Sequence, residues 1–87
     1  MVEKQVVVQN QVGLHARPVT FFIQKANEYK CSIWVEKDNR KVNAKSLLGV
    51  LSLGVARGME ITISAEGDDA QEAVDALEAL IESNFEE

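Results

Sequence analysis

The spacing of the apolar residues constrains the fold of this 87-residue chain more than any other feature. In residues 32–37 and 60–66 apolar side chains alternate with polar ones, which is typical of strands with one buried face. In residues 16–29 and 70–84 they recur at every third or fourth position, which is typical of helices with one buried face. Elements that each bury one face favour a sheet with helices packed against one of its sides.

The whole pattern predicts seven elements in the order βαββαβα. The strands are predicted at residues 2–8, 32–37, 40–43 and 60–66, and the helices at residues 16–29, 47–53 and 70–84. Pro18 places the start of the first helix at residues 15–16, because a residue without an amide hydrogen fits only in the first turn. Asp38 and Asn39 tolerate positive φ and predict a hairpin. The predicted fold class is α+β, an open-faced sandwich whose four-stranded antiparallel sheet is covered on one face by three helices.

Length, cysteine content and hydropathy narrow the class of protein. A chain of this length holds one domain, residues 1–87. The single cysteine, Cys31, cannot form an internal disulfide and is interpreted as a small apolar filler. No apolar run approaches the ~20 residues of a membrane span, and the N-terminal string MVEKQ lacks the apolar region of a signal peptide. We therefore expect a cytoplasmic protein with no membrane insertion.

Charge is distributed unevenly along the chain. The net charge of −5 argues against a nucleic-acid binder. Residues 1–59 contain nine Lys and Arg but four Asp and Glu, whereas residues 60–87 contain ten Asp and Glu and no Lys or Arg. If the two segments form different faces, the basic face would steer an acidic protein partner. The acidic segment is interpreted as a solvated helix surface.

The only histidine, His15, lies in the string GLHARP. Gly13 permits a backbone bend before it, and Pro18 holds it at or just before the first helical turn. Unpaired N–H groups and the positive dipole end of a helix start attract anions, and Arg17 adds a fixed positive charge. The same surroundings disfavour imidazolium, so His15 is expected to be neutral at about pH 7 with a free lone pair. The site is suited to forming a phosphohistidine, although a lone histidine is more often a surface or capping residue.

Ser46 is the second candidate site residue. It is predicted to cap the short helix at residues 47–53, and capping alone would explain a serine there. A helix of this length cannot bury every side, so Leu47, Leu48 and Leu51 are expected to form a small apolar docking patch. A phosphate is tolerated at a helix N-terminus, so a kinase could modify Ser46 without unfolding the helix.

Patterns for other chemistries are missing from the sequence. Lys45 and Ser46 imitate the end of a phosphate-binding loop, but Asn39 and Ala44 occupy its two glycine positions. No second histidine or cysteine completes a metal site, and no GxSxG elbow supports a hydrolase. We therefore expect no cofactor, no metal and no enzymatic activity of the chain's own, and the phosphoryl group must come from a partner.

Three strings of the sequence resemble one known family. GLHARP at residues 13–18, VNAKSLLGVLSLGVARG at 42–58 and EITISAEG at 60–67 are similar to HPr, the histidine-containing phosphocarriers of the bacterial sugar phosphotransferase system. The resemblance covers the whole chain and implies the βαββαβα sandwich. It also implies that His15 accepts a phosphoryl group at Nδ1 from enzyme I, which draws it from phosphoenolpyruvate. His15 would pass the group to IIA domains of sugar permeases, with Arg17 stabilising the phosphate.

The resemblance gives Ser46 a regulatory role. In Gram-positive-type members the matching serine is the target of an HPr kinase/phosphorylase, and the phosphorylated form is a corepressor for a catabolite-control transcription regulator. We expect a monomer that makes no direct contact with nucleic acid.

One alternative is a regulatory HPr-like module that acts only through Ser46, with His15 as an inert cap. One branch of the family, the catabolite-repression HPr-like proteins, lacks the histidine, so the presence of His15 favours the carrier. A nitrogen-system paralogue would share His15, but Ser46 followed by Leu-Leu-Gly fits the sugar branch better. A small metal chaperone would need a thiol pair, which one cysteine cannot provide.

Overall fold

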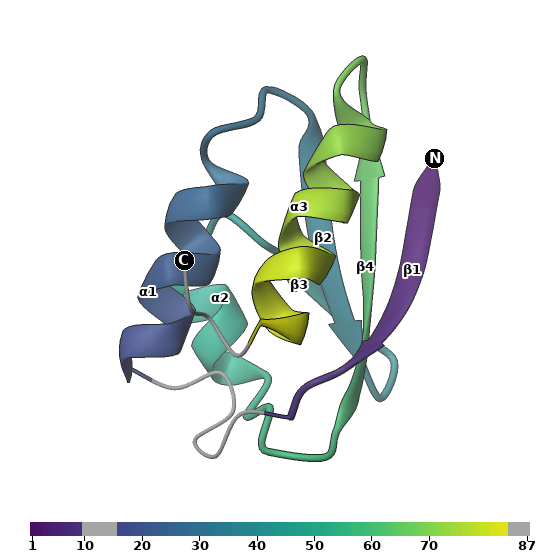
Figure 1. Ribbon diagram of the computed structural model, residues 1–87. Helices are drawn as coiled ribbons and strands as arrows, with labels where there is room; N and C mark the ends of the chain where they lie inside the picture. Colours follow the sequence, from purple (N-terminus) through teal and green to yellow (C-terminus); the bar gives the residue numbers. More distant parts are fainter. Residues whose placement is uncertain (10–15, 84–87) are drawn as a thin grey trace.

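The computed structural model describes residues 1–9 and 16–83, with side chains described for residues 1–9 and 19–83. Its strands and helices follow one another in the predicted order (Figure 1). The strands are β1 (Val2–Val7), β2 (Ser32–Lys37), β3 (Arg40–Asn43) and β4 (Glu60–Glu66). The helices are α1 (Ala16–Ala26), α2 (Leu47–Ser52) and α3 (Ala70–Glu82). The order βαββαβα is therefore confirmed.

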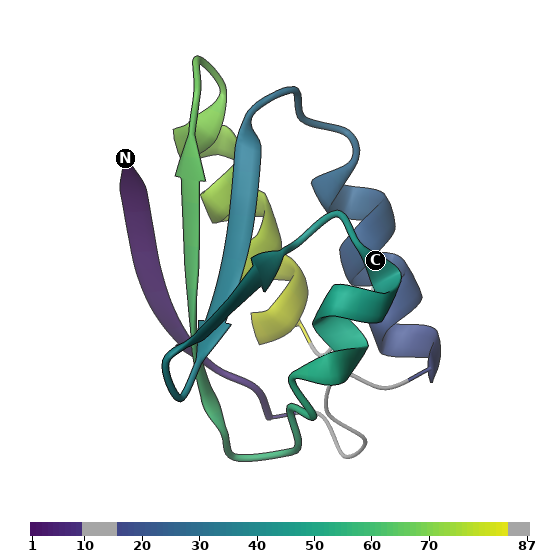
Figure 2. The same ribbon diagram turned by 180° about the vertical axis from the view of Figure 1, so that it is seen from behind.

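The strands form one antiparallel sheet in the order β1-β4-β2-β3. In this sheet Ile61 of β4 pairs with Val6 of β1, and Ala65 of β4 pairs with Ile33 of β2. The helices lie on one side of the sheet, and the described part of the chain places none on the other side (Figures 1 and 2). The predicted open-faced sandwich is therefore confirmed.

The core lies between the sheet and the helices. Ile23, on the predicted apolar face of the first helix, is only partly buried. The other residues of the predicted apolar faces are buried core members: Val19, Phe22 and Ala26 of α1, Ile33 and Val35 of β2, Ile61, Ile63 and Ala65 of β4, and Ala73, Val74, Leu77, Leu80 and Ile81 of α3. These helices and strands turn their apolar faces toward the same interior, because burial of apolar surface stabilises the fold. Within the described residues no helix is long and apolar enough to cross a membrane.

The element ends differ from the prediction by a few residues. α1 ends at Ala26 rather than Tyr29, because the chain tightens there and the Tyr29 N–H donates to the Ala26 carbonyl oxygen at 3.3 Å. α2 ends at Ser52, with Leu53 as its C-cap. The predicted end of the last helix, at residue 84, lies outside the described residues.

Two connections show the backbone conformations that their residue types favour. Asp38 and Asn39 have φ of 51° and 70°, as predicted for the hairpin between β2 and β3. Gly67, between β4 and α3, has φ of 142°, and a Cβ at this position would lie 2.8 Å from the Cβ of Cys31. Cys31 itself is buried, as expected of a small filler, and burial raises the pKa of its thiol. A side chain at residue 67 would push these two loops apart.

Candidate functional site

The start of α1 carries the predicted phosphoryl site. Arg17 is the second residue of α1, and the first turn contains no acidic residue. The first N–H groups of a helix have no partner within it, so this end is electropositive. His15 and Gly13 lie outside the described residues, as does the side chain of Arg17. The structure therefore defines the helix that follows His15, and the predicted roles of His15 and Arg17 remain predictions.

Ser46 is the N-cap of α2. Its backbone is extended, with φ of −103° and ψ of 117°, and its Oγ accepts a hydrogen bond from the Gly49 N–H at 3.1 Å. This bond satisfies one of the unpaired donors of the first turn. The predicted capping role is confirmed. The residue as a whole is half-buried.

Gly49 is a residue of this site that sequence reasoning missed. A Cβ at residue 49 would lie 3.3 Å from the Oγ and the Cβ of Ser46, which is closer than ordinary van der Waals contact. Glycine therefore leaves space beside the Ser46 hydroxyl. A sequence signal for Gly49 was available, because glycine inside a helix costs about 1 kcal/mol relative to alanine. A glycine within this six-residue helix therefore indicates a local reason for having no side chain.

The leucines after Ser46 differ in exposure. Leu48 is 80% exposed and Leu47 is 46% exposed, whereas Leu51 packs partly against the core. Val50, on the inner side of α2, is fully buried. Large apolar side chains exposed next to each other are typical of contact surfaces. Leu47 and Leu48 are thus available to a partner, and Leu51 is available only in part.

The two candidate regions lie on neighbouring helices. α1 and α2 contact each other and run in opposite directions (Figures 1 and 2). The N-terminal end of α1 therefore lies near the C-terminal end of α2, and Ser46 lies at the other end of α2. A rise of about 1.5 Å per residue makes α2 roughly 9 Å long. The fold thus places both regions on one side of the molecule, toward opposite ends of the α1–α2 pair.

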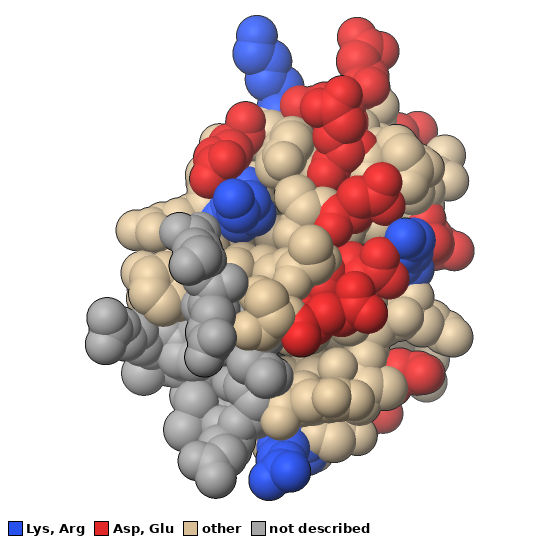
Figure 3. Space-filling view, in the orientation of Figure 1, with Lys and Arg blue, Asp and Glu red and all other residues tan. Residues whose placement is uncertain are grey.

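Acidic side chains of the C-terminal segment gather on one helix surface. Acidic side chains cluster over α3 (Figure 3), where Glu72, Asp75, Glu78 and Glu82 are found. Lys4 of β1 donates to Glu78 at 2.7 Å and to Asp75 at 3.3 Å. These carboxylates raise the pKa of Lys4, with the Glu78 hydrogen bond as the largest cause. The prediction of a helix surface is confirmed for these four acidic residues, whereas Glu60 and Glu66 lie in β4.

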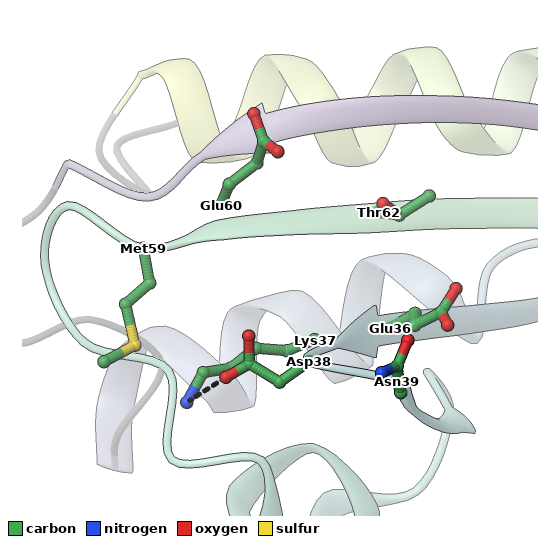
Figure 4. Close-up of a pocket in the computed structure, with 7 residues that line it drawn as sticks. All are labelled: Glu36, Lys37, Asp38, Asn39, Met59, Glu60 and Thr62. Carbon is green, nitrogen blue, oxygen red and sulfur yellow. Dashed lines mark ion pairs between the residues drawn. The ribbon is translucent and has the colours of Figure 1, made fainter.

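A hollow on the open face of the sheet lies apart from the predicted site residues. Its volume is about 480 Å³, and Figure 4 shows its lining: Glu36, Lys37, Asp38, Asn39, Met59, Glu60 and Thr62. An ion pair joins Lys37 and Asp38 at 3.9 Å. Within residues 1–9 and 16–83, no group of three or more His, Cys, Asp or Glu side chains could hold a metal ion.

The fold and the site define a class of small α+β proteins with an open-faced sheet. In this class the first helix, α1, packs beside a short, serine-capped helix, α2. Residues 2–83 match the family model PTS-HPr, described as the PTS HPr component phosphorylation site. The chain belongs to this HPr family of the phosphotransferase system. Membership places it among carrier and regulatory proteins rather than enzymes.

Individual relatives are similar over nearly the whole chain. The HPr-like protein Crh of Halalkalibacterium halodurans is 52% identical over 94% of this chain and 98% of its own length. The structure of HPr-C-His from Thermoanaerobacter tengcongensis has a TM-score of 0.97 and 55% identity, and covers 100% of this chain and 99% of its own. The phosphocarrier protein HPr of Bacillus anthracis str. Ames has a TM-score of 0.90 and 48% identity, over 92% of this chain and 95% of its own.

Proposed function

We propose that this chain is a cytoplasmic phosphocarrier of the sugar phosphotransferase system, accepting a phosphoryl group on His15 from enzyme I and donating it to IIA domains of sugar permeases. The observation that carries the proposal is the position of His15 directly before α1, with Arg17 in the first turn. Because the catabolite-repression HPr-like branch of the family lacks the matching histidine, the presence of His15 favours the carrier.

The chemistry follows from the helix start. A neutral imidazole has a lone pair on one ring nitrogen, and this lone pair attacks the phosphorus atom. The new P–N bond at Nδ1 forms as the bond between phosphorus and the donor group on enzyme I breaks, and the donor keeps that electron pair. The N–H groups of the first turn and the Arg17 guanidinium balance the charge of the phosphoryl oxygens. Transfer to a IIA domain reverses these steps.

Ser46 is proposed as the regulatory phosphorylation site. Its hydroxyl lies at a helix N-terminus beside exposed Leu47 and Leu48, and Gly49 leaves space next to it. An HPr kinase/phosphorylase would transfer phosphate to Oγ, which adds about 1.5 to 2 negative charges. The modified surface would then bind a catabolite-control transcription regulator.

A second candidate function is regulation through Ser46 alone. It is favoured by the 52% identity to a relative named HPr-like protein Crh, because such proteins are regulatory members of the family. In this case His15 would be an inert helix cap. Both candidates use the same α2 surface, and they differ in whether His15 accepts a phosphoryl group.

Incubation with enzyme I and phosphoenolpyruvate separates the two candidates. We expect an acid-labile, base-stable phosphate on the wild-type chain and on Ser46→Ala, and none on His15→Ala. A known HPr in the same reaction shows that enzyme I is active. If the known HPr is phosphorylated and the wild-type chain is not, the carrier function is refuted and the regulatory function is favoured.

A further inference from the structure

α2 needs contacts from outside the helix to keep its place. It spans six residues, and an isolated helix of that length is marginal in water. Val50 is its fully buried residue, and the side chains at the start of the helix are exposed. Ser46 provides a capping bond at the N-terminal end. At the C-terminal end, the N–H groups of Leu53 and Gly54 bond to the Val50 and Leu51 carbonyl oxygens. The carbonyls of Ser52 and Leu53 themselves take partners from another segment.

Two cationic side chains of the β2–β3 hairpin contact the C-terminal end of α2. The Arg40 guanidinium donates to the Ser52 carbonyl oxygen at 2.9 Å and to the Ser52 Oγ at 3.2 Å. The Lys37 Nζ donates to the Leu53 carbonyl oxygen at 3.1 Å. The last carbonyls of a helix lack partners within it and form the negative end of the dipole. Arg40 and Lys37 thus satisfy these acceptors and compensate their charge.

The neighbouring Lys41 points the other way. Successive residues of a strand lie on opposite faces of the sheet. Arg40 pairs with Lys37 across the hairpin, and both reach the helix side. Lys41 instead lies with its Nζ 4.9 Å from the centre of the Trp34 ring, on the open face. Arg40 therefore contacts α2, whereas the adjacent Lys41 contacts Trp34 on the open face of the sheet.

We infer that Arg40 and Lys37 are positioning residues that hold α2 in the orientation from which Leu47 and Leu48 meet a partner protein. The inference rests on the proposed function for the identity of that partner, whereas the anchoring is a property of the free chain. If α2 is loosened, a smaller fraction of the molecules holds Leu47 and Leu48 in the orientation that binds the partner protein. Apparent affinity falls in proportion to that fraction.

Hydrogen–deuterium exchange of the free protein tests the anchoring. The N–H groups of Leu53 and Gly54 bond to carbonyls of the last turn of α2, so their exchange reports its opening. Arg40→Gln and Lys37→Gln should each speed this exchange by roughly two- to tenfold, which corresponds to one net hydrogen bond. Lys41→Gln removes the same charge and should leave the rates unchanged. Unchanged rates in both anchor variants, or equal acceleration in all three, would overturn the inference.

Steady-state phosphorylation by enzyme I and phosphoenolpyruvate tests the consequence for docking. Arg40→Gln and Lys37→Gln should each raise KM about two- to threefold with kcat unchanged, and Lys41→Gln should match the wild type. The Lys37 side chain is only 17% exposed, so a shared KM rise points to α2 rather than to direct contact with the partner. A rise confined to Arg40→Gln would overturn the positioning role. A wild-type chain that accepts no phosphoryl group would refute the carrier function, and the exchange rates would still decide the anchoring.

Discussion

The carboxylate of Asp69 accepts a hydrogen bond from the backbone N–H of Cys31 at 3.0 Å. Its other oxygen accepts from the Lys30 N–H at 2.9 Å. Asp69 is the N-cap residue of α3, yet its side chain makes no capping bond and instead ties the start of α3 to the loop before β2. These bonds favour the ionised carboxylate, so they lower the pKa of Asp69, with the Lys30 N–H as the largest cause.

Asp69→Asn should lower the thermal stability at neutral pH, because the amide has one acceptor oxygen for two N–H groups. The loss should depend on pH. Since the pKa of Asp69 is lowered in the folded state, its contribution is fully present above the unfolded value of about 3.9 and disappears as pH falls through the folded value. Thermal unfolding of both proteins between neutral and strongly acidic pH measures the difference in Tm. A difference of constant size would contradict the role of the carboxylate.

Gly67→Ala should destabilise the fold more than Gly58→Ala. Both glycines have positive φ, 142° and 88°, so either alanine is strained by about 1 to 2 kcal/mol. At residue 67 the added Cβ would also lie 2.8 Å from the Cβ of Cys31, whereas nothing lies within 4 Å at residue 58. We expect this contact to add about 1 to 3 kcal/mol to the loss. Urea unfolding gives both values, and equal losses would show that the two loops separate freely.

Ser46→Asp should raise the apparent KM for phosphorylation of His15 by enzyme I, and Ser46→Ala should raise it less, by no more than loss of the α2 cap bond causes. The added negative charge opposes an acidic partner surface. The effect should shrink as salt rises, because screening limits its reach to about 8 Å at physiological ionic strength.

Steady-state kinetics at low and high salt measure this effect. Ser46→Ala loses a cap bond of about 1 kcal/mol, so the variants are compared at a temperature at which all are folded. If Ser46→Asp and Ser46→Ala share one KM, a negative charge at residue 46 does not oppose docking.

Arg17→Glu should slow phosphoryl transfer to and from His15. It replaces a charge that stabilises the phosphate with one that repels it, and it weakens docking to an acidic partner. Rapid-quench measurements at low salt in both directions give the rates. Lys41→Glu, on the open face of the sheet, makes the same charge change and should transfer at the wild-type rate. Wild-type rates for Arg17→Glu would contradict the basic-face hypothesis.

The sequence pattern predicted the strands well, because the direction of each side chain in a strand is set by the local backbone. β2, β3 and β4 occupy the predicted residues 32–37, 40–43 and 60–66, because alternation along a strand is a property of the strand's own backbone. The end of α1 was missed because a helix end depends on how its last turn tightens, and i→i−3 bonds leave no periodic signal.

For the candidate site, the family and the capping role of Ser46 are confirmed, and the roles of His15 and Arg17 stay predictions. The string GLHARP and the surroundings of Ser46 are contiguous, so they carried the family resemblance and the capping role. The side-chain contacts at the end of α2 and at the start of α3 were missed because they join distant residues. Arg40 and Ser52 are 12 positions apart, and Asp69 and Cys31 are 38 apart.

The sequence by itself therefore determined the elements, the face that each one buries, and the family. Only the tertiary structure decided that a β-hairpin holds the end of α2 and that Gly67 must be small beside Cys31. The physical reason is that periodicity records the direction of a side chain relative to its own backbone. The meeting of two distant side chains depends instead on how the whole core packs, through many weak contacts that no local pattern contains.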